Sequence, residues 1–271
     1  MSGDGFMAAA GAVINALFVL GAIYIYLSLV RQIAARSEPE PPDGARQFGT
    51  PEALLALGLA TLFGLNAAAA TSHSGNVHLS TGDLLANAMV SLGLLLFVYA
   101  FLTFRRLPVG WLTGVGRIGF WRTFATGVVL LLAAYPLIFV ADLLTQWFLR
   151  EPPSRQDILE LFSASQTIQQ RVIIIVLAVA IAPCVEEFIF RFFLYGVLKR
   201  YFGRGVGLVA NALLFAAVHA HIPSAAPLFV LGSCFTVAFE WSGSILVPMT
   251  MHALFNSLTL LVLAFPDHFP S

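Results

Sequence analysis

The chain has 271 residues, of which 59% are hydrophobic and only 10% charged, and its mean hydropathy of +0.87 lies far above that of soluble domains. Lys plus Arg and Asp plus Glu are equal at 14 each, so the chain lacks the basic excess that a nucleic-acid partner requires. These values exclude an ordinary soluble domain and a nucleic-acid-binding protein. The lipid bilayer is the expected partner.

Long apolar runs follow one another along the chain, each near the roughly 20 residues that a helix needs to cross a bilayer. Backbone groups in lipid need internal hydrogen-bond partners, and continuous apolar runs satisfy them as helices rather than as alternating barrel strands. The predicted fold class is therefore all-α, a polytopic integral membrane helical bundle with about eight transmembrane helices. The expected spans are 7–30, 51–70, 84–104, 123–149, 172–199, 205–222, 225–241 and 245–265.

Three of the four gaps between the first five spans are distinctive polar or glycine-rich segments. Residues 31–50 contain Pro39, Pro41 and Pro42 and indicate an exposed linker. Residues 105–120 are rich in glycine. Residues 151–170 begin with Glu-Pro-Pro-Ser and then show an apolar spacing that predicts a short helix lying on the membrane interface.

The basic residues of the connecting loops predict the orientation, because Lys and Arg are retained on the cytoplasmic side. If the N-terminus lies outside, ten basic loop residues fall inside and three fall outside. We therefore expect a multi-pass protein of the bacterial inner membrane with both termini non-cytoplasmic. The inside group is Arg31, Arg36, Arg46, Arg105, Arg106, Arg117, Arg122, Lys199, Arg200 and Arg204, and the outside group is Arg150, Arg155 and Arg171.

Ionisable side chains are costly in hydrocarbon, so those found inside spans usually face the bundle interior and mark function. Glu186, Glu187 and Arg191 lie within one span, and His219 and His252 lie within two others. At 1.5 Å per residue, the three spans place these groups at depths that differ by less than about 10 Å. The sequence thus predicts a polar site inside the bilayer, assembled from three helices.

The two adjacent glutamates point about 100° apart on a helix, so their roles must differ. Glu187 has the i,i+4 spacing that favours an ion pair with Arg191, which leaves Glu186 free to act as a general base beside an imidazole such as His219. His252 and Asn256 share one helix face and are candidate donors to an oxyanion. Together these roles point to peptide hydrolysis.

Three motifs carry a family resemblance. Glu-Glu-x-x-x-Arg at 186–191, Phe-x-x-x-His at 215–219 and His-x-x-x-Asn at 252–256 resemble, in that order, the motifs of the CAAX prenyl protease type II and bacteriocin-processing family, also called CPBP. The resemblance covers about a third of the chain, from Arg171 to Leu263, and divides it into N-terminal helices at 1–170 and a catalytic core at 171–265.

The resemblance implies an intramembrane endopeptidase of the glutamic type that acts on a membrane-associated or lipid-modified peptide or protein, including CAAX-type C-terminal processing. It implies that Glu186 and His219 activate the water and that His252 and Asn256 stabilise the oxyanion. Glu187 and Arg191 would brace the first of the three helices. Phe215 is expected to pack as a wall beside the histidine or the substrate.

Metal dependence is the main chemical alternative, since one Glu and two His could bind zinc. The His-Glu-x-x-His pattern, which places two ligands on one helical turn, is absent from the sequence, and the resemblance favours a metal-independent mechanism. We therefore expect no cofactor and no metal ligand.

Two other function classes compete with the protease. A transporter or proton relay could use the buried Glu and His residues, but the sequence shows no repeat and a relay gives no role to Asn256. A non-catalytic membrane scaffold or immunity protein would not need the acidic residues at all.

Overall fold

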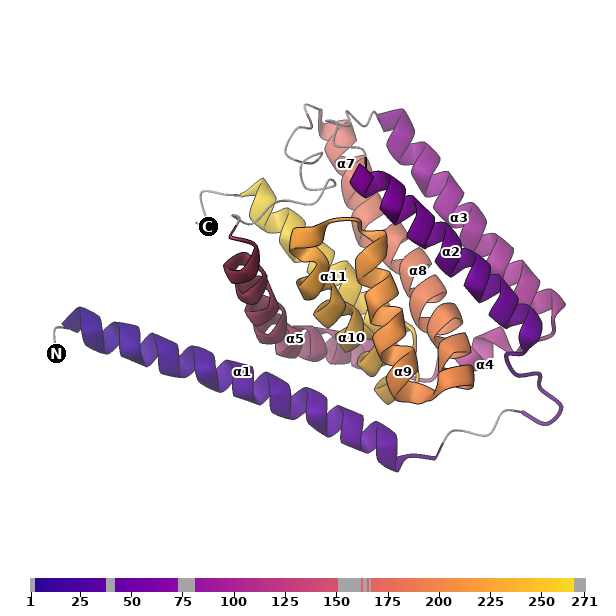
Figure 1. Ribbon diagram of the computed structural model, residues 1–271, viewed down its shortest axis with the longest axis horizontal. Coiled ribbons are helices and arrows are strands. Elements are labelled where there is room, and N and C mark those ends of the chain that lie inside the picture. Colours follow the sequence, from indigo (N-terminus) through magenta and orange to yellow (C-terminus); the bar gives the residue numbers. More distant parts are fainter. Residues whose placement is uncertain are drawn as a thin grey trace.

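The structure is a computed structural model that describes residues 3–37, 42–72, 81–150, 162, 165 and 167–265. In this part of the chain the regular secondary structure is helical throughout and no strand occurs, which confirms the predicted all-α fold (Figure 1). The elements in chain order are α1 (Gly3–Ala35), α2 (Thr50–Ser72), α3 (Thr81–Phe104), α4 (Val109–Thr113), α5 (Phe120–Leu149), α7 (Ile168–Val176), η1 (Leu177–Ile181), α8 (Ala182–Glu186), η2 (Glu187–Leu194), α9 (Tyr195–Val218), η3 (Ile222–Ser224), α10 (Ala225–Ser242) and α11 (Leu246–Ala264).

Seven helical segments in the described part are long and apolar enough to cross a membrane, so the chain is a multi-pass integral membrane protein. The difference from the expected eight lies in Ile168–Val218, which forms one segment of 51 residues. At 1.5 Å per residue a straight helix of this length would measure about 75 Å, far more than a bilayer.

A turn at Gly203 divides this long segment. Gly203 has φ 78° and ψ 170°, a conformation outside the helical region that glycine adopts without a steric penalty. A Cβ on Gly207 would lie 2.9 Å from the backbone nitrogen of Lys199, so the two arms fold back closely on each other. The expected spans 172–199 and 205–222 are therefore two antiparallel arms joined by a very tight turn.

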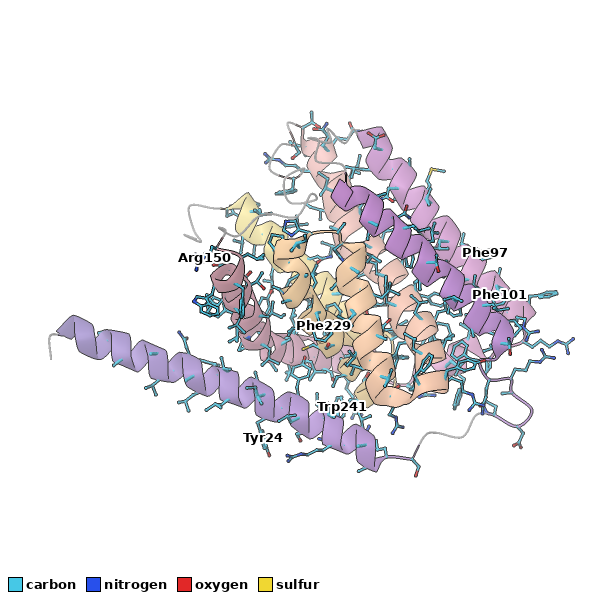
Figure 2. All side chains as sticks on the ribbon, viewed as in Figure 1. Tyr24, Phe97, Phe101, Arg150, Phe229 and Trp241 are labelled. Atoms are coloured by element: carbon cyan, nitrogen blue, oxygen red, sulfur yellow. The ribbon has the colours of Figure 1, made fainter. Side chains whose placement is uncertain are left out.

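Outward-facing side chains are mainly apolar, as expected for a surface in lipid. Tyr24 of α1 is 71% exposed and Phe97 of α3 is 56% exposed, and both side chains point away from the bundle (Figure 2). The first helix joins the bundle along its C-terminal half, where the Tyr26 hydroxyl donates a hydrogen bond of 2.8 Å to the Leu130 carbonyl of α5.

The linker before α2 is exposed over most of its described residues, as predicted, but its end packs against the bundle. Residues 38–41 lie outside the described part, but Phe48 packs against the rings of Phe192 and Phe193. A Cβ on Gly196 would lie 2.6 Å from the Phe48 ring, so this close contact requires glycine. The end of the linker is therefore held against η2 and the start of α9.

The glycine-rich segment between α3 and α5 contains the short helix α4, which fixes the start of the last span. The backbone N–H of Ile245 donates to the Thr113 carbonyl at 2.9 Å. Gly114, with φ 65°, lies so close to the Gly243 carbonyl that a Cβ would clash with it. The interfacial helix expected at 151–170 falls largely outside the described residues.

Two π-helical segments interrupt the helix that carries the first motif. They are η1 at Leu177–Ile181 and η2 at Glu187–Leu194, with the single turn of α8 between them. A π-helix is wider than an α-helix, leaves backbone carbonyls less regularly paired, and is found mostly at functional sites. The motif therefore lies on a helix that departs from regular geometry at Glu187.

Candidate active site

Glu187 lies at the centre of the polar cluster and is completely buried. Its Oε2 lies 3.2 Å from Nε of Arg191, the i,i+4 ion pair that the spacing predicts. Its Oε1 accepts a hydrogen bond of 2.8 Å from Nδ1 of His252. One carboxylate therefore joins the first and third motifs, a connection that the sequence did not indicate.

Arg191 is also completely buried, and aromatic rings surround its guanidinium. The guanidinium carbon lies 4.0 Å from the ring centroid of Phe215, 5.1 Å from that of Phe235 and 5.9 Å from that of Phe190. A cation over an aromatic face in a desolvated site gains on the order of 2 kcal/mol. The rings and Glu187 together compensate a charge that could not otherwise lie in an apolar bundle.

His252 is held in one orientation by three groups. Glu187 binds its Nδ1, and the ring of Phe235 stacks on its imidazole with centroids 5.2 Å apart and an interplanar angle of 29°. The ring of Phe215 meets the imidazole edge to face, with the two ring centroids 6.1 Å apart. This fixed ring presents Nε2 toward Glu186, whose Oε2 lies 3.9 Å away.

Glu186 differs from its neighbour in both exposure and partners. Its side chain is 29% exposed, whereas that of Glu187 has no exposure. Its Oε2 is buried and accepts no hydrogen bond from any described residue. The two adjacent glutamates therefore occupy different environments, as helix geometry predicts, and Glu186 is the one that can reach another molecule.

The imidazole beside Glu186 is His252, and this differs from our expectation. We expected His219 there, but within 4 Å of Glu186 the basic side chain in the described part of the chain is that of His252. Residue spacing sets the height of each residue along its helix but not the direction in which its side chain points. His219 instead lies across Phe215, with the two ring centroids 4.8 Å apart.

His219 is half-buried at the C-terminal end of α9, and its Nδ1 lies 2.8 Å from the Phe215 carbonyl. A carbonyl only accepts, so Nδ1 carries the hydrogen and Nε2 is left as an acceptor in the neutral ring. Phe215 thereby contacts both candidate histidines, which gives it the position of a wall between them.

Asn256 makes a contact that the sequence did not predict. Its Nδ2 donates a hydrogen bond of 2.7 Å to the carbonyl of Ala178, which lies in the π-helical segment η1. A side-chain amide has two N–H donors, so this bond fixes the amide and leaves one donor for another acceptor. The irregular helix before the first motif therefore positions a residue of the third motif.

Three residues that sequence reasoning missed complete the site: Ala178, Gly232 and Phe235. Gly232 of α10 lies where a Cβ would approach the Phe215 ring to 3.0 Å and the Arg191 guanidinium to 3.4 Å. A glycine in the middle of an apolar helix is costly and indicates a close approach, so Gly232 carried a usable signal. Phe235 and Ala178 are two of many similar apolar residues in these helices, and no sequence signal distinguished them.

The described residues contain no group of three His, Cys, Asp or Glu side chains arranged to hold a metal ion. Glu187 directs both of its oxygens at groups that are or can become cationic, Arg191 and His252. Whether the reaction needs a metal is a separate question, which chelation can test.

Residues 168–258 match the model of a protein family described as type II CAAX prenyl endopeptidase, Rce1-like. The family resemblance of the three motifs is thereby confirmed. The matched segment begins at the first residue of α7 and ends inside α11, so it includes all three motifs. Comparison with curated proteins and with solved structures gave no match. The family match supports a CAAX-type intramembrane endopeptidase in general terms, and it agrees with the seven apolar helices.

Proposed function

We propose that the protein is a glutamic intramembrane endopeptidase in which Glu186 activates a water molecule for attack on a peptide bond. The observation that carries this proposal is the contrast between the two glutamates. Both oxygens of Glu187 face a basic group, Arg191 at 3.2 Å and His252 at 2.8 Å, and its side chain is fully buried, whereas the side chain of Glu186 is 29% exposed and its one basic neighbour within 4 Å in the described part of the chain is His252 at 3.9 Å. A general base needs free lone pairs and access to the reacting molecule.

His219 is the proposed second group on the water. Its Nδ1 is engaged by the Phe215 carbonyl, so Nε2 can accept a hydrogen bond from a water molecule that also contacts Glu186. In this arrangement the proton leaves the water for Glu186 as the oxygen attacks the carbonyl carbon. Glu186 then gives that proton to the departing amine nitrogen.

His252 and Asn256 are the proposed oxyanion donors. Asn256 retains one N–H after bonding Ala178, and a fixed amide costs little reorganisation when charge develops. His252 donates Nδ1–H to Glu187, so its Nε2 carries a hydrogen only when the ring is doubly protonated. The oxyanion role of His252 therefore requires its imidazolium form during the reaction.

The proposed substrate is a membrane-associated, lipid-modified protein that is cut near its C-terminus. Support comes from the matched family, whose description names CAAX prenyl endopeptidases. Glu186 and His252 lie within helical segments that are long and apolar enough to cross a membrane, and His219 directly follows the end of one, so we propose that the substrate reaches the site from within the membrane. Residues 171–265 are proposed as the catalytic core, and the mechanism requires no metal.

The proposed orientation places both termini outside the cytoplasm of a bacterial inner membrane. Six of the ten basic residues expected inside line one pocket at a single end of the bundle, which supports placing that end on the cytoplasmic side. Reporter fusions at each terminus would test this orientation directly.

The decisive experiment is proteolysis of a lipid-modified peptide library by the full chain in liposomes, with Glu186→Gln as the matched variant. Glu186→Gln keeps the shape of the side chain and removes the base. We expect cleavage by the unsubstituted protein and none by the variant. Equal cleavage by both would refute the proposed base, and absence of cleavage of every peptide by both would leave transport or a scaffold role as the better hypothesis.

A further inference from the structure

A pocket lies at the basic end of the bundle, away from the catalytic cluster. It has a volume of about 450 Å³ and is lined by the end of α1, the linker after it, α4, η2, the start of α9 and the end of α10. None of Glu186, His219, His252 or Asn256 lines it. Lys199 on its wall is 13 residues from Glu186, which corresponds to about 20 Å along the helix.

The lining of this pocket is strongly cationic. Its only acidic residue in the described part of the chain is Glu240, which is 10% exposed and lies 2.7 Å from Nζ of Lys199 and 3.5 Å from Nε of Arg204. The six basic residues on the wall are Arg36, Arg46, Arg117, Lys199, Arg200 and Arg204. One carboxylate faces six cations, so the pocket carries a large excess of positive charge.

Two of the arginines are held by tryptophans rather than by acids. Arg36 donates to the Trp241 carbonyl at 2.8 Å and lies over the Trp241 ring. Arg117 donates to the Trp111 carbonyl at 2.9 Å and lies over the Trp111 ring. These contacts orient the guanidinium groups without neutralising them. Trp241 lies at the end of α10, beside α1 (Figure 2).

Arg46 and Arg200 complete the positive side of the pocket. Both are exposed, and neither side chain forms a hydrogen bond or ion pair with any described residue. Their full donor capacity is therefore open to a ligand, and a planar guanidinium binds phosphate oxygens in pairs. Like charges gathered in one concave site repel one another, and a bound anion removes that repulsion.

The walls of the pocket are also suited to a molecule with an apolar part. Phe48, Phe192, Trp111 and Trp241 line it together with the basic residues. Tryptophans and arginines that meet at the ends of spans are typical of the membrane interface, and basic pockets between transmembrane helices on the cytoplasmic side bind lipid head groups. A free phosphate ion would leave most of this volume and its aromatic wall unused.

From this combination the geometry points to a binding site for the phosphate head group of an anionic phospholipid, formed by Arg36, Arg46, Arg117 and Arg200 against the aromatic wall. The acyl chains would lie along the apolar outer surface of the neighbouring helices. This inference does not depend on the proposed catalytic mechanism, since no catalytic residue takes part in it.

Native mass spectrometry of the full chain in non-ionic detergent, titrated with phosphatidylglycerol, tests the site. The variant is Arg46→Gln with Arg200→Gln, and the control is Arg31→Gln with Arg122→Gln, two exposed arginines that do not line the pocket. At about fivefold per interfacial charge, the pocket variant should bind the lipid about 25-fold more weakly, and the control should bind it as the unsubstituted protein does. Equal weakening in both double variants would mean that lipid binds through net charge alone and would overturn the site.

Parallel titrations separate the sources of the phosphate. Phosphatidylcholine, which has no net charge, should bind at least tenfold more weakly than phosphatidylglycerol. Equal binding of the two lipids would show non-specific lipid association and would overturn the anionic head-group site. Glycerol 3-phosphate at equal concentration should not displace phosphatidylglycerol, and displacement would assign the pocket to a soluble phosphate compound. Should the double variant fail to fold, Arg46→Gln and Arg200→Gln are titrated singly, and each should weaken binding about fivefold.

Discussion

The Oε1 of Glu187 accepts a 2.8 Å hydrogen bond from Nδ1 of His252, and its Oε2 lies 3.2 Å from Arg191. A residue of the first motif thereby holds the proposed oxyanion histidine of the third motif in place. The second glutamate of the motif is consequently a positioning residue as well as a partner for the buried arginine.

Glu187→Ala should lower both stability and activity. It leaves Arg191 as a buried unpaired charge, which costs on the order of 3–5 kcal/mol of the free energy of unfolding, and it also releases His252. Adding Arg191→Leu removes the unpaired charge, so the double variant should recover part of the melting temperature in detergent without recovering cleavage. Thermal unfolding beside a cleavage assay measures both. Recovered cleavage in the double variant would show that Glu187 does not position His252.

Glu186→Gln should behave in the opposite way, with chemistry lost and stability kept. Its carboxylate has no donor on Oε2 and one distant neighbour at 3.9 Å, so its removal breaks no strong contact. His219→Ala should likewise abolish cleavage, with a small loss of stability because the ring is half-buried. The measurement is the cleavage rate of purified variants whose melting temperatures are recorded in the same buffer. A Glu186→Gln protein that cleaves at the normal rate would exclude Glu186 as the base.

Asn256 should contribute to both the fold and the transition state. Asn256→Ala leaves the Ala178 carbonyl without its donor, which costs about 1–3 kcal/mol of stability. Loss of one oxyanion donor lowers kcat by about 10² to 10³. Asn256→Asp provides the matched comparison, because a carboxylate is similar in size but repels both the carbonyl and the oxyanion. Steady-state kinetics should show the loss in kcat, and a change confined to KM would argue for a substrate-binding role instead.

Activity should survive prolonged dialysis against a strong chelator, and elemental analysis should find no stoichiometric zinc. The proposed mechanism uses Glu186, His219, His252 and Asn256 without a metal. A site that held zinc would lose activity on chelation and regain it when zinc is restored. That result would identify the cluster as a Glu/His metal centre.

Much of the fold could be predicted from the sequence, because apolar run length sets where helices cross a bilayer. The predicted spans agree with the helices to within a few residues, and the one difference in number arises at Gly203, where the turn is too short to interrupt the helical segment. The charged and histidine residues of the candidate site were singled out by the cost of ionisable groups in hydrocarbon, and their roles remain predictions. The contacts between them could not be predicted in the same way.

Residue spacing gives the height of a side chain on its helix, but the contacts between helices depend on rotation and on local geometry. The π-helical segments η1, which contains Ala178, and η2, which begins at Glu187, change the rotation of the helix and its local geometry. No pattern in the sequence indicates these segments. For this reason we expected His219 beside Glu186, whereas the structure has His252 there. The hydrogen bond from Asn256 to the Ala178 carbonyl was likewise not predicted.

The aromatic enclosure of Arg191 should tolerate no added volume at Gly232. A Cβ there would lie 3.0 Å from Cδ1 of Phe215, closer than ordinary contact, and 3.4 Å from the Arg191 guanidinium. Phe215 cannot move freely because it also contacts His219 and His252. Gly232→Ala should therefore lower the melting temperature and reduce kcat, with Gly232→Val doing more of both. Gly58→Ala is the control, since nothing lies within 4 Å of its added Cβ and alanine favours a helix by up to about 1 kcal/mol. If Gly232→Ala were as stable and active as Gly58→Ala, the rings around Arg191 would be loosely packed and would not position the two histidines.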